Sequence, residues 1–160
     1  MQLFFSLILW FMASAMEISS SAFKNGGDIP SLYTCQGENI SPPLSIKNVP
    51  DNAKSLSLIV MDPDAPSGPY CHLVIFNTDP VKTEIKEAKL KGTFGTNSFG
   101  DTAYGGPCPP SGTHRYIFTL YALDQMLSVK ESCSKSELEN AMKGHIIGSA
   151  KLEGKYQKHK

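Results

Sequence analysis

Five polar side chains in this sequence have the types and spacing to bind an anion or move a proton. Asp62 and Asp64 stand two positions apart, directly after an apolar run. His72 lies inside a second apolar run, and His114 and Tyr116 open a third. Carboxylates, imidazoles and a phenol that converge from three such runs would form a small polar pocket suited to an anion.

The loop before His114 contributes backbone groups to the candidate pocket. Gly105 and Gly106 precede Pro107, and glycine lets the backbone approach a ligand closely and present amides to an oxyanion. Alone, this tripeptide is a weak turn signal. Arg115 follows His114 and points to the opposite face of the strand, where we expect it to pair with a carboxylate.

Each of these residues also has a structural interpretation. Aspartates on either side of a proline are common in turns, where they accept hydrogen bonds from nearby amides. Alternation along the strand places His72 on the same face as Val74 and Phe76, where a histidine is more often a packed core residue than a ligand. His114 and Tyr116 share one strand face, and this second histidine favours the pocket.

The same residues permit acid–base catalysis or metal binding in principle. The sequence has no Gly-x-Ser-x-Gly elbow for a nucleophile, and Cys108 is the one thiol in the candidate loops that could serve near two histidines. No spacing of His72, His114 and an aspartate matches a metal site. We therefore expect a non-enzymatic site without metal or cofactor, and a hydrolase is a distant alternative.

Short strands must position these groups. Residues 55–61, 71–77 and 116–122 read as strands, and residues 150–153 alternate like a closing strand. Ser134 and Glu137 match a capping box, which predicts one late helix that ends near Gly144. The apolar stripe of that helix is Leu138, Ala141, Met142, His145 and Ile146. The pattern predicts a β-rich domain with a late helix.

Length and charge exclude several classes of protein. The 160 residues suit a single domain, and fifteen basic residues balance fifteen acidic ones. No segment concentrates lysine and arginine into the basic stripe that phosphate neutralisation requires, so we expect no nucleic-acid partner.

The first residues read as a secretory signal. Residues 3–12 are apolar apart from Ser6, and residues 13–15 supply small side chains for cleavage. A bilayer span takes about 20 apolar residues, so stable membrane insertion is not expected. We predict a signal peptide over residues 1–15 and a domain over residues 16–160, in the periplasm or secreted. The protein would be cytoplasmic if the segment is not a working signal.

An oxidising compartment would permit disulfides among the four cysteines. Cys35, Cys71, Cys108 and Cys133 allow three connectivities, and no Cys-x-x-Cys pair suggests a zinc ribbon or a thioredoxin-type site. Cys71 lies within a predicted strand, which disfavours its pairing with Cys133.

Three longer motifs resemble one known family. They are Tyr-Thr-Cys-Gln-Gly-Glu-Asn-Ile-Ser-Pro-Pro-Leu at residues 33–44, Asp-Pro-Asp-Ala-Pro at 62–66, and the stretch from Gly-Gly-Pro-Cys-Pro-Pro to His-Arg-Tyr at 105–116. In this order they resemble the phosphatidylethanolamine-binding proteins, in their bacterial and archaeal Raf-kinase-inhibitor-like branch. The resemblance covers about residues 18–156.

The resemblance implies a mainly β fold, an antiparallel β-sandwich with the late helix at its edge. It also favours a disulfide between Cys35 and Cys108, which both lie in loops of the family pattern. The ligand-binding residues that it implies are Asp62, His72, Gly105, Gly106, Pro107, His114 and Tyr116.

The function that the resemblance implies is binding rather than catalysis. The ligand would be a small anion with a phosphoryl or carboxylate group, such as a phospholipid headgroup or a phosphorylated or acidic peptide. The family regulates kinase- or protease-type partners, and we expect the same here. The alternative is a secreted inhibitor or effector that acts through its surface loops and keeps only a vestigial pocket.

Overall fold

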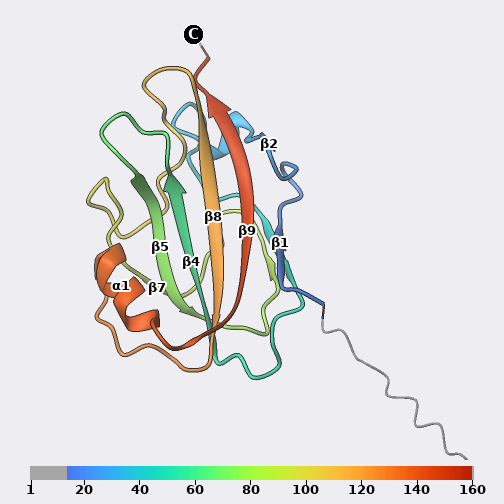
Figure 1. Ribbon diagram of the computed structural model, residues 1–160. Helices are drawn as coiled ribbons and strands as arrows, with labels where there is room; N and C mark the ends of the chain where they lie inside the picture. The colour runs from blue at the N-terminus through green and yellow to red at the C-terminus, as the bar shows by residue number, and fades with distance from the viewer. Residues whose placement is uncertain (1–13, 160) are drawn as a thin grey trace, which may run out of the picture.

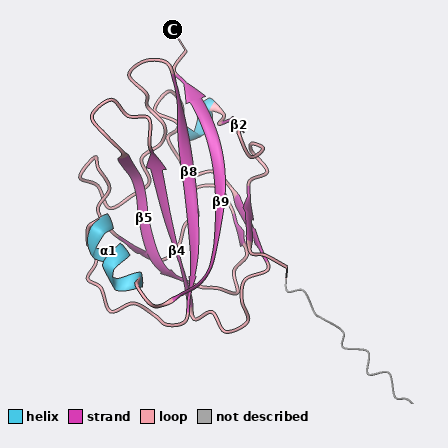
Figure 2. Cartoon of the chain, viewed as in Figure 1, coloured by secondary structure: helices cyan, strands magenta, loops and turns pink. Residues whose placement is uncertain are grey.

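The computed structural model describes residues 14–159, and strands dominate that part of the chain (Figures 1 and 2). The predicted signal segment, residues 1–15, lies outside the described residues except for its last two. The elements in chain order are β1 (Glu17–Ser19), β2 (Gly27–Asp28), a 3-10 helix (Ser31–Tyr33), β3 (Leu44–Lys47), β4 (Ser55–Asp62), β5 (Tyr70–Thr78), β6 (Glu84–Ile85), β7 (Thr93–Phe94), β8 (Thr113–Leu123), α1 (Lys135–Met142) and β9 (Ile146–Gln157).

These strands form two sheets. The smaller has the order β1-β3-β6, and the larger has the order β2-β9-β8-β4-β5-β7. Every pairing is antiparallel except the short parallel contact between β2 and β9. The architecture confirms the predicted mainly β, antiparallel sandwich with one late helix.

The central strand β4 is buried on both faces, which explains its nearly continuous apolar sequence. Leu58 and Val60 pack with Ile46 of β3 in the core between the two sheets. Ile59 points the other way and packs with Leu138 of α1. The small sheet therefore covers one face of the large sheet, and α1 covers part of the other (Figure 1).

The helix begins where the sequence predicts. Ser134 Oγ accepts a hydrogen bond from the Glu137 amide at 3.2 Å, and the Glu137 carboxylate accepts one from the Ser134 amide at 2.7 Å. This is a complete capping box, which satisfies two amides that the first helical turn leaves without partners.

The helix ends near Gly144, as predicted, but its apolar stripe is shorter than predicted. Gly144 adopts φ +79°, a left-handed conformation that stops the helix just after Met142. The predicted apolar stripe was wrong in its last two members. His145 instead bonds Asp124 through Nδ1 at 2.9 Å, and Ile146 begins β9 with 45% of its surface exposed.

The closing strand is longer than its alternating residues suggested. β9 pairs with the whole of β8, from Thr113 opposite Gln157 to Leu123 opposite Ile146. This long ladder fixes the start of β8, where two of the candidate site residues lie. Among residues 14–159, no helix is long and apolar enough to cross a membrane.

Candidate anion-binding site

The centre of the site is a buried carboxylate–imidazole pair. Asp62 ends β4 and His114 lies near the start of β8, and only 4% and 7% of their surfaces are exposed. Asp62 Oδ2 lies 2.7 Å from His114 Nδ1, and Asp62 Oδ1 accepts a hydrogen bond from the Asp64 amide at 2.8 Å. Both carboxylate oxygens are thus occupied, and the imidazole has one fixed orientation.

His72 lies on the opposite face of β5 from the one that alternation predicts. In the ladder between β4 and β5, Val60 faces Leu73 and Met61 faces Cys71, so His72 is an extra residue in a β-bulge. The bulge turns the imidazole away from the helix-covered face, and the ring lies edge-on to Tyr116, 5.1 Å between centroids. Bulges next to functional sites re-aim side chains in this way.

The bulge separates His72 from its predicted companions. Val74 and Phe76 pack with α1, whereas Tyr116 belongs to the core between the sheets. The prediction that His72 shares a strand face with Val74 and Phe76 was therefore wrong, because simple alternation does not hold across a bulge. The change matters for function, since it brings the second imidazole to the same cavity as Asp62.

A backbone carbonyl fixes the protonation of His72. Its Nδ1 lies 2.7 Å from the Gly105 carbonyl oxygen, which can only accept, so Nδ1 carries the proton. Burial lowers the pKa of His72, although the Gly105 carbonyl and the charge of Asp62 act in the opposite direction. Burial outweighs both, so the neutral imidazole is favoured.

Gly105 and Gly106 shape the site without presenting free amides. The Gly105 amide donates to the His72 carbonyl at 2.9 Å, and the Gly106 amide donates to Asn39 Oδ1 at 2.8 Å. A Cβ on Gly105 would lie 2.4 Å from the Phe99 ring. A Cβ on Gly106 would collide with the Tyr33 carbonyl oxygen, so glycine is required there. Neither amide is free to act as the predicted oxyanion donor.

Tyr116 supplies a protonated hydroxyl beside the two histidines. Only 1% of its surface is exposed. Burial, and then the negative charge of Asp62, raises the pKa of Tyr116 far above its ordinary value. The phenol therefore stays neutral throughout the physiological range.

Arg115 points away from the cavity and pairs with a carboxylate, as its position in the strand predicts. Its Nε and Nη2 donate to the two oxygens of Asp64 at 2.9 and 2.8 Å. The Arg115 guanidinium and backbone amide hold the pKa of Asp64 at about 2. Of the two motif carboxylates, Asp62 serves the cavity and Asp64 fixes the turn to β8.

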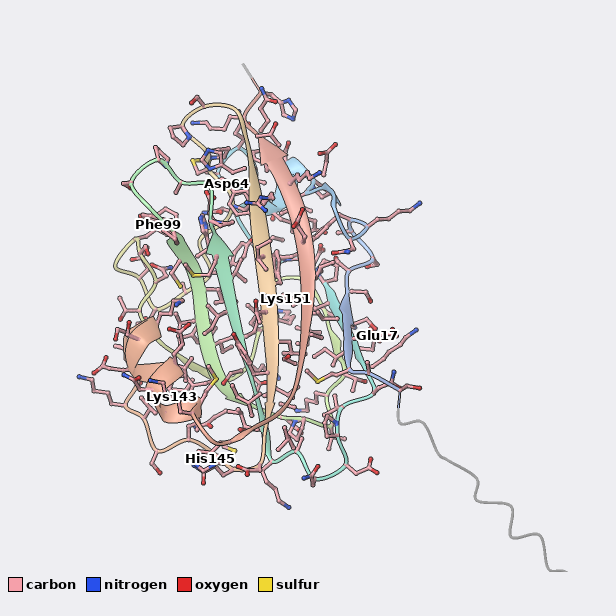
Figure 3. All side chains as sticks on the ribbon, viewed as in Figure 1. Glu17, Asp64, Phe99, Lys143, His145 and Lys151 are labelled. Carbon is pink, nitrogen blue, oxygen red and sulfur yellow. A yellow bond between two sulfur atoms is a disulfide. The ribbon has the colours of Figure 1, made fainter. Side chains whose placement is uncertain are left out.

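The cavity itself has a volume of about 290 Å³. It lies at the end of the large sheet where β4 finishes and β5 begins, the end at which Figure 3 labels Asp64 and Phe99. Its lining residues are Asp62, Ala65, Pro66, Ser67, Tyr70, His72, Phe99, Cys108 and Pro110.

The structure brings most of the predicted set together. Asp62 and His72 line the cavity, while His114 and Tyr116 stand directly behind them. Gly105 bonds His72, but Gly106 and Pro107 lie outside the lining, and the Pro107 carbonyl accepts from the Cys35 amide.

Sequence reasoning missed the aromatic part of the wall. Phe99 packs edge-on against Tyr70 and His72 at centroid distances of 5.0 and 5.3 Å, and 45% of its surface is exposed. Phe99 comes from the loop after β7, which carries no motif. A large exposed aromatic between two polar motifs was the one available signal.

The predicted disulfide is present and forms part of the site. Cys35 and Cys108 are bridged, with their Cα atoms 5.4 Å apart, and Cys108 lines the cavity. Cys71 and Cys133 are free and buried, so the less favoured pairing does not form. In residues 14–159, no three His, Cys, Asp or Glu side chains gather closely enough to hold a metal ion.

Larger cavities exist, but they lack this chemistry. One of about 460 Å³ lies beside Tyr156 and Ser31 at the far end of β9. The Tyr156 hydroxyl there already donates to Gln36 at 2.6 Å. The larger cavity is lined by Asp28 and His159, which form no pair within residues 14–159. The smaller cavity is the better site because its carboxylate, Asp62, is paired with the buried His114 imidazole and a second imidazole, His72, lines the same wall.

The chain is similar to proteins from archaea and bacteria. The model of the family described as phosphatidylethanolamine-binding protein matches residues 19–157. A protein of Methanothermobacter thermautotrophicus named UPF0098 is 50% identical over 150 residues, which is 89% of this chain and 99% of the relative. A UPF0098 protein of Chlamydia trachomatis is 46% identical over 149 residues, again 89% of this chain and 99% of the relative.

Solved structures agree with this relationship. The crystal structure of a phosphatidylethanolamine-binding protein homologue from Chlamydia trachomatis superimposes with a TM-score of 0.88 at 46% identity, covering 91% of this chain and 99% of that one. Escherichia coli YbcL, described as a new member of the mammalian family, gives a TM-score of 0.83 at 27% identity, covering 91% and 100%. The chain therefore belongs to the phosphatidylethanolamine-binding protein family.

Proposed function

We propose that the protein binds a small phosphoryl or carboxylate group in the cavity between Asp62 and Phe99, and that it does so without turnover. The observation that carries this proposal is the state of the two imidazoles. His72 and His114 both have Nδ1 engaged by an acceptor, and neither Nε2 has a hydrogen-bond partner among residues 14–159. His72 lines the cavity, and His114 lies directly behind Asp62 in the cavity wall.

Proton uptake explains how such a cavity would hold an anion. A neutral imidazole with its proton on Nδ1 can only accept at Nε2. An anion beside Asp62 therefore needs a proton, carried either by an imidazole or by the ligand itself. Because burial lowers the pKa of His72, we expect anion affinity to rise as the pH falls below about 6.5 and to fall above it.

The absence of an activated nucleophile supports binding rather than catalysis. Cys108 is the one cysteine in the cavity wall, and it is held in the disulfide. Ser67 also lines the cavity, yet within the described residues its hydroxyl has no hydrogen bond to either imidazole. A nucleophile without an adjacent base is weak. Turnover of any ester in a broad panel would refute this part of the proposal.

The family relationship supports the choice of ligand and partner in this proposal. The family name supports a phospholipid headgroup as one source of the phosphoryl group, and a phosphorylated or acidic peptide offers the same chemistry. We propose that occupancy of the cavity regulates a kinase- or protease-type partner.

The test is an NMR titration with inorganic phosphate and with phosphoethanolamine, at pH values on either side of 6.5. Shifts should centre on His72 and His114 and strengthen at the lower pH. His114→Asn keeps a donor toward Asp62 and removes Nε2, so it should abolish the shifts without unfolding the protein. Arg115→Ala is the matched control, because the Arg115 guanidinium points away from the cavity and pairs with Asp64. Binding that survives His114→Asn unchanged would overturn the proposal.

A further inference from the structure

The connection between β5 and β7 folds around a groove far from the anion cavity. The groove has a volume of about 420 Å³. Four lysines line it, Lys82, Lys86, Lys89 and Lys91, together with Ile85 of β6. We expected no basic stripe from the sequence, yet residues 82–91 alone hold four of the fifteen basic residues, and the fold arranges all four around this groove.

Most of these lysines have no internal counter-charge. Lys86, Lys89 and Lys91 are exposed and form no ion pair within residues 14–159. Lys82 makes one long contact with Asp79, at 3.9 Å. Exposed ammonium groups held together at one groove repel one another, and an anionic occupant would relieve that repulsion.

Two carboxylates, Asp79 and Glu84, also line the groove, and the fold already uses both of them and the neighbouring Glu87. Glu84 accepts a hydrogen bond from the Ser45 hydroxyl, and Glu87 accepts one from the Tyr33 hydroxyl at 2.9 Å. Asp79 accepts from the Val81 amide at 3.0 Å in addition to its contact with Lys82. These bonds direct the carboxylates toward neighbouring polar groups, so the net charge of the groove lining stays positive.

We propose that this groove docks a short acidic segment of a partner protein. Glutamate or aspartate side chains of that segment would pair with the lysines, and an apolar side chain would lie on Ile85. The lining contains no aromatic side chain on which bases could stack, which disfavours single-stranded nucleic acid. A concave groove also fits a chain segment better than the plane of a membrane.

The groove and the cavity lined by Asp62 and His72 lie at opposite ends of β5. The cavity contacts Tyr70 at the start of the strand, and the groove contacts Thr78 at its end. At about 3.3 Å per residue the two are separated by roughly 25 Å. Figure 1 shows β5 running beside β4 in the large sheet between these ends. The proposal for the groove does not depend on the proposed anion site, and each proposal can be tested separately.

The test measures the fluorescence anisotropy of a labelled, glutamate-rich peptide with a central leucine, against its glutamine counterpart. The variant is Lys86→Gln/Lys89→Gln/Lys91→Gln. The matched control is Lys24→Gln/Lys143→Gln/Lys151→Gln, which removes the same charge from exposed positions outside the groove. Figure 3 labels Lys143 beside the helix and Lys151 on β9.

We expect the groove variant to bind the acidic peptide about tenfold more weakly, the effect of losing three exposed ion pairs, and the control to bind like the wild type. Binding should weaken with added salt. Equal binding of the glutamine peptide, or equal losses in both variants, would overturn the proposal. Tighter binding to an oligonucleotide of equal length or to phosphatidylserine vesicles would overturn it in favour of those partners.

Discussion

At the scale of single residues, His72 shows how burial and one carbonyl set the chemistry of the cavity. Its ring is 3% exposed, and its Nδ1 proton is committed to Gly105. The neutral imidazole is therefore an acceptor toward the cavity, not a standing positive charge. An anion pocket built on such a group selects ligands that bring a proton or are bound at lower pH.

The lowered pKa of His72 also predicts how stability depends on pH. Below about 6.5 the unfolded chain takes up a proton on this residue before the folded protein does, so the free energy of unfolding should fall as the pH drops. His72→Asn keeps a donor for the Gly105 carbonyl but cannot titrate. Denaturant unfolding at pH 7.5 and 5.5 should show a smaller pH effect in this variant. An identical pH dependence in the two proteins would contradict the assignment.

The Asp64–Arg115 pair predicts a second titration, at more acidic pH. The folded protein holds the carboxyl pKa at about 2, below the unfolded value, so the pair stabilises above about pH 4 and this contribution disappears as the pH falls toward 2. The Arg115 side chain is 50% exposed and that of Asp64 is 30% exposed, so solvent screens the pair and its contribution to stability is small. Asp64→Asn should lose that contribution at pH 7 and nothing near pH 2, as measured by denaturant unfolding.

At the scale of elements, the alternation of side chains along a strand could be predicted from the sequence, whereas the bulge that interrupts it could not. The alternation of β8 correctly put His114 and Tyr116 on one face, because nothing disturbs that strand between them. The bulge at His72 has no local signature, since it depends on the register between β4 and β5. Phe99 reaches the cavity from a loop whose path depends on Asn97, which is buried and caps the turn.

The helix gives a direct test at this scale. Ser134 closes the capping box and leads into a helix of only 8 residues, whose Leu138 and Met142 cover one face of the large sheet. Ser134→Ala should cost about 1 kcal/mol of unfolding free energy, because an amide of the first turn loses its acceptor. Ser134→Asp should restore most of it. Equal stability of Ser134→Ala and the wild type in thermal and denaturant unfolding would show that the cap is dispensable.

At the scale of the whole molecule, the compartment decides whether the disulfide can exist. We propose export to the periplasm or outside the cell, with cleavage after Ala15 and a mature chain that begins at Met16. Intact-mass analysis of the protein expressed with its native N-terminus checks this. A full-length mass in the soluble cytosolic fraction would contradict export and would place the cysteines in a reducing compartment.

The disulfide links global stability to the cavity. Cys35 and Cys108 are 73 residues apart in sequence, and their bond ties the loop after the 3-10 helix to the cavity wall. Closing a loop of that length contributes about 2–4 kcal/mol. Cys35→Ser/Cys108→Ser should lose stability by that amount and bind phosphate more weakly, because the Cys108 wall is no longer anchored.

Reduction provides the matching control, because Cys71 and Cys133 are already free thiols. A reductant should lower the stability and phosphate affinity of the wild type to the level of the double variant and leave the double variant unchanged. Non-reducing peptide mapping should recover Cys35 and Cys108 in one linked pair. Wild-type affinity that persists after complete reduction would show that the cavity wall is held by packing alone, through contacts such as Phe99 on Gly105.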